Sequence, residues 1–275
     1  MRVAAGGIAL LMIRLVAVVG QREEPVEEKI ETDRIKIEEA TKVHANADTN
    51  SDGKVSLQEI LEYSMVMRKA AAGRGDHAAV EELDANRDGK LSLEEVLKDI
   101  GTWADDADNE EKKSAEALRA VESEKFRVAD GDADGYLSRE ELAAMFYPEI
   151  HDGVLAITAA ASLREKDRDG DGELTQREFW EGDVSDDEDL TISEEETKDF
   201  NALDKDGNGR VNLEELKAWE SGMFHTEEAM KNLFEICDKD GDMHVTLKEL
   251  HDSWEEIDGT DVRYHLMEWA WHDEL

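Results

Sequence analysis

Apolar residues recur at helical spacing in short stretches of this chain, which alternate with acidic, glycine-containing segments about twelve residues long. Several stretches place apolar side chains at the i, i+3, i+4 or i+7 positions that share one helix face. They are Ile60, Tyr63 and Met67; Leu142, Met145 and Phe146; and Met230, Leu233, Phe234 and Cys237. Pro148 cannot continue the helix before it, because proline lacks an N–H. The pattern predicts an all-α protein of short amphipathic helices joined by polar loops.

The segment Asp167–Glu178 is the most regular of the polar loops. Oxygen-bearing side chains stand at its positions 1, 3, 5, 9 and 12, with glycine at 6 and an aliphatic residue at 8. These residues are Asp167, Asp169, Asp171, Thr175 and Glu178, with Gly172 and Leu174. Calcium takes about six to eight oxygen ligands, and this is the EF-hand spacing. We expect the Glu173 carbonyl to serve at position 7, Thr175 to act on the metal directly or through a water, and Glu178 to give both carboxylate oxygens. Gly172 should adopt a positive φ.

A single such loop could be a solvated acidic turn, but the pattern recurs five more times. We expect metal ligands at positions 1, 3, 5, 7 and 12 of every copy, with the backbone carbonyl serving at position 7. The sets are Asp48, Asn50, Asp52, Lys54 and Glu59; Asp84, Asn86, Asp88, Lys90 and Glu95; Asp130, Asp132, Asp134, Tyr136 and Glu141; Asp204, Asp206, Asn208, Arg210 and Glu215; and Asp238, Asp240, Asp242, His244 and Glu249. In most loops, positions 9 and 12 also form a capping box, which links metal binding to the start of the exit helix.

The loops, numbered 1 to 6 in chain order, differ in two respects. Loops 3, 4 and 6 carry four ligating acids, whereas loops 1, 2 and 5 carry three. Loop 6 has Met243 where the other loops have glycine at position 6. A bulky residue at positive φ costs about 1–2 kcal/mol, so metal binding is most in doubt at this loop.

The loop starts are separated by 36, 46, 37, 37 and 34 residues, and the long second interval favours pairing of consecutive loops. This interpretation predicts three EF-hand pairs, each joined by a short β-bridge: loops 1–2 in residues 35–104, loops 3–4 in 105–183 and loops 5–6 in 184–255. An acidic lead over 21–34 and a tail over 256–275 would flank them. Residues 185–196 resemble a degenerate loop, but Ser193 and Glu196 are better explained as a capping box.

Composition limits the possible function. The net charge of −39 and the pI near 4.4 exclude a basic nucleic-acid surface and disfavour binding to anionic membranes. Cys237 is the single cysteine, so no internal disulfide can form. The sequence shows no His/Cys metal cluster, nucleophile constellation or phosphate-cradling loop, so we expect a protein that is not an enzyme.

The two ends carry address-like sequences. An apolar run after Met1-Arg2 turns polar at Gln21, which predicts a signal peptide over residues 1–20. Arg14 interrupts that run, and an uncleaved anchor is the rival interpretation. The chain ends His-Asp-Glu-Leu at residues 272–275, a receptor-read retrieval signal of the endoplasmic reticulum. Together they predict the endoplasmic reticulum lumen, with the HDEL retrieval receptor as a partner and no stable membrane insertion after cleavage.

Six loops between these two addresses resemble the CREC family, the reticulocalbin and calumenin group of the secretory pathway. The segments 126–130 (FRVAD) and 145–149 (MFYPE) are similar to those that flank the third hand of that family. The chain departs from the family in Met243, in Arg14 and in having no Asn-x-Ser/Thr site. The resemblance implies a low-affinity calcium binder of the lumen that assists or regulates client proteins.

Two function classes follow from these observations. The leading one is a luminal calcium buffer that also acts as a calcium-dependent interaction partner. The alternative is a chaperone or folding-enzyme adaptor that calcium switches. A cytosolic calcium sensor is disfavoured by both addresses and by the lack of a methionine-rich set on the exit helices.

Overall fold

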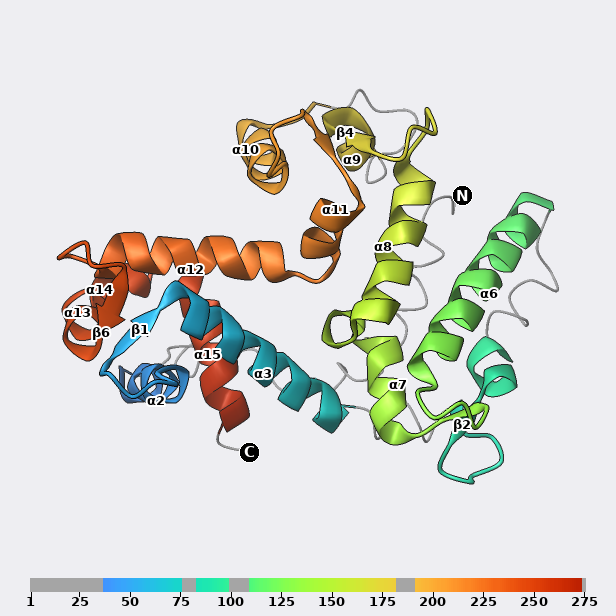
Figure 1. The fold of residues 1–275 in the computed structure, drawn as a ribbon, viewed down its shortest axis with the longest axis horizontal. Helices are drawn as coiled ribbons and strands as arrows, with labels where there is room; N and C mark the ends of the chain where they lie inside the picture. Colours follow the sequence, from blue (N-terminus) through green and yellow to red (C-terminus); the bar gives the residue numbers. More distant parts are fainter. Residues whose placement is uncertain (1–36, 76–82, 99–108, 182–190, 274–275) are drawn as a thin grey trace, which may run out of the picture. The chain divides into compact units, whose positions relative to one another are not determined.

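The computed structural model describes residues 37–75, 83–98, 109–181 and 191–273, and these are mostly helical with short antiparallel strand pairs (Figure 1). The predicted signal peptide, the acidic lead and the last two residues of the HDEL sequence lie outside this part. The described residues fall into two compact units. One lies within Ala72–Gly222, and the other combines residues from Arg22–Ala71 and Met223–Leu275.

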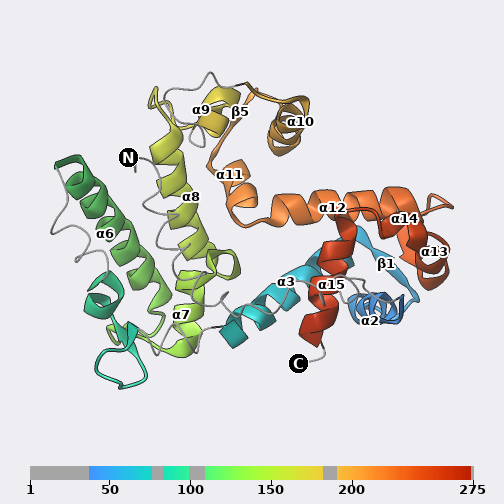
Figure 2. The same cartoon turned by 180° about the vertical axis from the view of Figure 1, so that it is seen from behind.

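The second unit brings the N-terminal and C-terminal helix-loop-helix segments together, blue with orange to red in both views (Figures 1 and 2). Loop 1 lies between α2 and α3, and loop 6 between α12 and α13, with α14 and α15 following. The bounds are α2 Ile37–Ala47, β1 Lys54–Ser56, α3 Leu57–Gly75, α12 Met223–Cys237, β6 His244–Thr246, α13 Leu247–Asp252, α14 Trp254–Ile257 and α15 Val262–Asp273.

One apolar core joins the helices of this unit. The stripes predicted on α3 and α12 supply buried side chains to it, and α15 adds Leu266 and Trp269. Tyr63 of α3 meets Trp269 edge-on, with ring centroids 6.0 Å apart. Buried His44 of α2 donates from Nε2 to the Val245 carbonyl of β6 over 2.8 Å. The first and last helix-loop-helix segments therefore share one interior.

The other unit contains loops 2 to 5. The helix that leaves loop 2 is described over residues 93–98. The remaining elements are β2 Leu91–Ser92, α6 Asn109–Ala129, β3 Tyr136–Leu137, α7 Arg139–Phe146, the 3₁₀ helix η1 Pro148–Ile150, α8 Asp152–Lys166, β4 Leu174–Thr175, α9 Gln176–Glu181, α10 Glu194–Leu203, β5 Arg210–Val211 and α11 Leu213–Glu220. Helix α8 packs against both α6 and α11. The predicted end of α7 before Pro148 and the capping box of Ser193 and Glu196 are confirmed.

The strand pairing corrects the predicted order of the loops. Strand β1 of loop 1 pairs with β6 of loop 6, β2 of loop 2 with β3 of loop 3, and β4 of loop 4 with β5 of loop 5. The prediction of pairs 1–2, 3–4 and 5–6, assigned to residues 35–104, 105–183 and 184–255, is wrong. The β-bridges themselves are present, with Val55 opposite Val245, Leu91 opposite Leu137, and Leu174 opposite Val211.

The length of α3 gives a physical reason for this correction. It runs as one helix over 19 residues, about 28 Å at 1.5 Å per residue. Seven residues, 76–82, separate its end from Leu83, just before loop 2. Because α3 carries the chain about 28 Å away from loop 1, the interval between the starts of loops 1 and 2 did not show whether these two loops meet. Within the described residues, no helix has the length and apolar content needed to cross a bilayer.

Candidate metal centres

Loop 4 folds around the position-1 carboxylate. The Gly172 N–H donates to Asp167 Oδ2 over 2.9 Å, and the Asp171 N–H donates to Asp169 Oδ1 over 3.1 Å. Oxygens of Asp167, Asp169 and Glu178 lie within 4.8 Å of one another. The backbone N–H groups therefore orient the carboxylates toward a common point, where a cation would meet several oxygens at once.

The same geometry recurs in every loop. In all six, the position-6 N–H donates to Oδ2 of the position-1 aspartate over 2.7–3.0 Å. Three-carboxylate groups matching that of loop 4 occur in loops 3, 5 and 6. They are Asp130, Asp132 and Glu141; Asp204, Asp206 and Glu215; and Asp238, Asp240 and Glu249. Loops 1 and 2 place an amide oxygen at position 3, from Asn50 and Asn86, and each of these oxygens accepts a hydrogen bond from the position-5 N–H at 2.8 Å.

The position-12 glutamate also holds the start of the exit helix. In loop 4, Glu178 Oε2 accepts from the Thr175 N–H over 2.9 Å and from the Thr175 hydroxyl over 2.7 Å, and the Glu178 N–H donates back to that hydroxyl. Its Oε1 accepts from the Arg168 N–H. Reciprocal bonds between positions 9 and 12 occur in all six loops, so the predicted capping boxes are confirmed.

These hydrogen bonds favour the charged form of the glutamates. The donated backbone N–H at position 9 is the largest cause of a lowered pKa for four of them, and the Ser138 hydroxyl is the largest for the fifth. The four are Glu59, Glu95, Glu178 and Glu249, and the fifth is Glu141. A carboxylate held ionised by its own loop is ready to bind a cation.

Comparison with known proteins agrees with this geometry. Residues 45–62, 81–98 and 124–146 match the "EF hand" family model, and residues 184–253 match the "Secreted protein acidic and rich in cysteine Ca binding region" model. "Reticulocalbin-2" of Crotalus adamanteus is 30% identical over 183 residues, which cover 61% of this chain and 58% of that protein. The chain is a reticulocalbin-like EF-hand protein.

Two further relatives extend the comparison of this EF-hand chain. The "45 kDa calcium-binding protein" of Xenopus tropicalis is 25% identical over 150 residues, 51% of this chain and 42% of that protein. The chain thus spans about half the length of the curated relatives that it matches. Calcium-loaded apo-aequorin from Aequorea victoria is 16% identical with a TM-score of 0.27, covering 69% of this chain and 90% of that one. That score is too low for comparing the arrangement of the hands.

The chemistry of the donors fits calcium. The loops offer carboxylate, amide and hydroxyl oxygens together with backbone carbonyls, the hard ligands that Ca²⁺ takes in a flexible shell. Sulfur and imidazole, which softer metals prefer, are absent from positions 1, 3, 5, 9 and 12 of all six loops. The EF hands of this chain bind Ca²⁺.

The structure retains the shape of loop 6 despite its methionine. Met243 has φ 64°, and its N–H donates to Asp238 Oδ2 over 2.9 Å, as glycine does in the other loops. Its side chain is 76% exposed. A Cβ built on Gly172 would meet nothing within 4 Å, so this position is open and the cost of a side chain there is confined to the backbone.

A second left-handed position escaped the sequence analysis. Position 4 has positive φ in every loop, with Ser51, Arg87 and Ala133 in loops 1 to 3 and glycine in loops 4 to 6. The glycines Gly170, Gly207 and Gly241 were the available signal, but they occur in only half of the copies. Loop 6 therefore has glycine at position 4 and a side chain at position 6, whereas loops 1 to 3 have the reverse.

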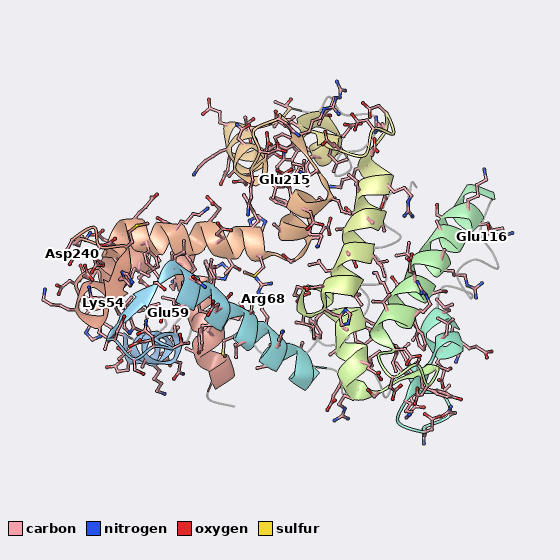
Figure 3. The ribbon with its side chains drawn as sticks, viewed as in Figure 1. Lys54, Glu59, Arg68, Glu116, Glu215 and Asp240 are labelled. Atoms are coloured by element: carbon pink, nitrogen blue, oxygen red, sulfur yellow. The ribbon has the colours of Figure 1, made fainter. Side chains whose placement is uncertain are left out.

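The sequence analysis also gave no role to the position-7 side chains. Lys54 of loop 1 forms an ion pair with Asp242 of loop 6, Lys90 of loop 2 with Asp134 of loop 3, and Arg210 of loop 5 with Asp171 of loop 4. Figure 3 labels Lys54 in the region where β1 and β6 meet. The hydrogen bond between the Lys54 ammonium and the Asp242 carboxylate raises the pKa of Lys54 and lowers the pKa of Asp242.

Proposed function

We propose that the chain is a low-affinity calcium buffer of the endoplasmic reticulum lumen. The observation that carries the proposal is the repetition of one oxygen-lined geometry in six loops, four of which gather three carboxylates within 4.8 Å. The relatives named for reticulocalbin and for calcium binding support it, as do the address-like ends of the sequence. A lumen rich in calcium suits sites with dissociation constants on the order of 10⁻⁴–10⁻³ M.

The proposal assigns the ligands by position. Side-chain oxygens at positions 1, 3 and 5, the backbone carbonyl at position 7 and both carboxylate oxygens at position 12 would hold each ion. In four loops, the hydroxyl at position 9 already donates to the position-12 glutamate, so it orients that carboxylate. We therefore give position 9 an orienting role in those loops and assign it no ligand oxygen.

Charge explains how calcium would change the protein. The metal-free chain has a net charge of −39, and like charges crowd within each loop. Filling six loops would add twelve positive charges and still leave an acidic exterior. Because the position-12 glutamate also caps the exit helix, the filled protein is more helical and more compact than the metal-free one.

The distribution of exposed apolar side chains favours a calcium buffer over a dedicated client adaptor. Among the described residues, the exposed large apolar side chains come from different elements and do not include a clustered methionine set. They are Val66, Tyr136, Met243, Leu247 and Tyr264. Scattered apolar residues are ordinary on soluble surfaces, whereas a partner groove needs a contiguous patch. Crosslinking in calcium tests this choice, because a reproducible client set would instead support the adaptor.

The experiment for the proposed function combines spectroscopy with localisation. We expect calcium to increase the far-ultraviolet helical signal of the full chain at high-micromolar to millimolar concentrations, about 10⁻⁴–10⁻³ M. In cells, we expect the chain to be protease-protected inside the endoplasmic reticulum and to be secreted when residues 272–275 are deleted. An unchanged spectrum would contradict calcium-linked folding, and a cytosolic full-length chain would contradict the location.

A further inference from the structure

The three observed pairs share a charge rule. Each bridge joins a loop with three ligating acids to a loop with four, in the pairs 1–6, 2–3 and 5–4. In every pair the three-acid loop carries a cation at position 7, whereas the four-acid loop carries histidine, tyrosine or glutamate there. The cations are Lys54, Lys90 and Arg210, and their counterparts are His244, Tyr136 and Glu173.

The contact that this rule produces is the same in all three pairs. The position-7 cation reaches across the bridge to Oδ2 of the position-5 aspartate in the partner loop. In the first pair, Lys54 lies opposite Thr246 in the register, two positions past the loop-6 residue His244. Both ion-pair partners are half-buried or exposed: the side chains of Lys54 and Asp242 are 41% and 30% exposed. The contact is therefore accessible to solvent ions.

Consecutive pairing would break the rule. Loops 3 and 4 both carry four acids, and neither has a cation at position 7. Their pairing would place Glu173 of loop 4 against the position-5 carboxylate of Asp134 in loop 3. Like charges facing each other across a two-stranded bridge are destabilising. The observed pairing instead gives each four-acid loop one cation from its partner.

We propose that Lys54, Lys90 and Arg210 are counter-ions built into the loop pairs, each selecting a four-acid partner loop and lowering that loop's calcium affinity. This inference rests on the proposed function, because it takes the position-5 aspartate as a calcium ligand. An ammonium or guanidinium group bound to that carboxylate competes with Ca²⁺ for its oxygen and repels the ion from close range. The three-acid loop of a pair thus regulates its four-acid partner.

The test uses the full chain and a signal from loop 6 itself. Met243 stands inside that loop, so the ¹³C-methyl resonance of Met243 reports calcium filling there by nuclear magnetic resonance. We expect Lys54→Gln to lower the calcium midpoint at Met243 about two- to fivefold, a modest change because the ion pair is accessible to solvent. Lys54→Arg should keep the wild-type midpoint, since loop 5 uses arginine for the same contact.

A matched control separates the contact from general charge. Lys248 is position 11 of loop 6, where α13 has begun; it is not one of the ligand positions, is 85% exposed, and pairs with Asp252. Lys248→Gln removes the same charge from the same neighbourhood, and we expect its midpoint to stay close to wild type. Equal midpoints for Lys54→Gln and Lys248→Gln, with calcium binding intact, would overturn the inference and leave the proposed function standing. A Met243 methyl resonance that does not change with calcium in the wild-type chain would overturn both the inference and the proposed function at loop 6.

Discussion

The pair of loops 1 and 6 and the pair of loops 4 and 5 are built alike from very different stretches of chain. The bridging cation and carboxylate are 188 residues apart in the first pair and 39 apart in the second. Both pairs nevertheless have a two-stranded bridge, a position-7 cation on a position-5 aspartate, and a capping glutamate at position 12. Complementarity between loops and helices, and not distance along the chain, therefore decides which loops meet.

The interiors of the two pairs differ more than their loops do. Pair 1–6 is closed by helix α15, whose Trp269 packs into the core that α3 and α12 share. Pair 4–5 instead gathers aromatic rings, with Phe179 5.0 Å from Trp219 and 5.8 Å from Phe200 by ring centroids. Its elements are close in sequence, so it can form from local contacts, whereas pair 1–6 requires both ends of the chain.

Removal of Trp269 gives the largest expected difference between the two pairs. Trp269→Ala should cost about 3–5 kcal/mol in the free energy of unfolding. The Trp269 side chain is only 2% exposed, so its removal leaves a cavity in the core. Hydrogen exchange should show lost protection in both α3 and α12, while β4 and β5 keep theirs. Tyr264→Ala on the same helix is the control, since Tyr264 is 56% exposed and should change stability by about 0.5 kcal/mol or less. Loss confined to α12–α15 would contradict a shared interior.

The next effect separates the observed pairing from the consecutive one. Glu249→Gln should weaken calcium binding at loop 6 on the order of 100-fold, because it removes a bidentate charge from the shell. Binding at loop 1, followed at the Gly53 amide, should weaken as well, while loop 5, followed at the Gly209 amide, is spared.

Glu196→Gln serves as the control for that experiment. Glu196 forms a capping box with Ser193 in the same way as Glu249 does with Thr246, but it lies outside the six loops. It should leave calcium binding at loops 1 and 6 unchanged. An effect of Glu249→Gln on loop 5 in place of loop 1 would restore the consecutive pairing.

A smaller effect concerns position 6, where the two pairs differ by one residue. Met243→Gly should relieve about 1–2 kcal/mol of backbone cost and tighten calcium binding at loop 6 by roughly thirtyfold at most. Gly172→Met in loop 4, where φ is +87°, should weaken binding by a similar factor. Calorimetric titration of both variants measures the two changes. Equal affinities for Met243→Gly and the wild type would show that the backbone strain is already offset.

The pH dependence should be the same in both pairs. The folded-state pKa values of Glu178 and Glu249 lie below the ordinary 4.5, so their contribution to stability is present above that value and is lost as pH falls through the folded pKa. The melting temperature of the metal-free chain should therefore stay level near neutral pH and drop below about pH 4.5. Glu249→Gln should weaken this dependence for pair 1–6 alone. A melting temperature that rises on acidification would contradict the sign.

The loops could be predicted from sequence because the geometry of each loop depends on residues that lie close together in the chain. The spacing of oxygens, the glycine at position 6 and the box between positions 9 and 12 all act within about twelve residues. The pairing could not be predicted in the same way. Position 8 is valine or leucine in all six loops, so Val55 could bridge to Leu91 as readily as to Val245. The difference between three-acid and four-acid loops was visible in the sequence, but only the observed contact of Lys54 with Asp242 shows what it does.

A count of bound calcium per chain tests the central claim most directly, namely that all six loops bind an ion, including the one with Met243. Equilibrium dialysis of the full chain at saturating calcium, with Glu249→Gln measured beside it, gives that count. The account predicts six ions for the wild type and one fewer for the variant. A wild-type count of five or fewer, or a count that Glu249→Gln leaves unchanged, would contradict it.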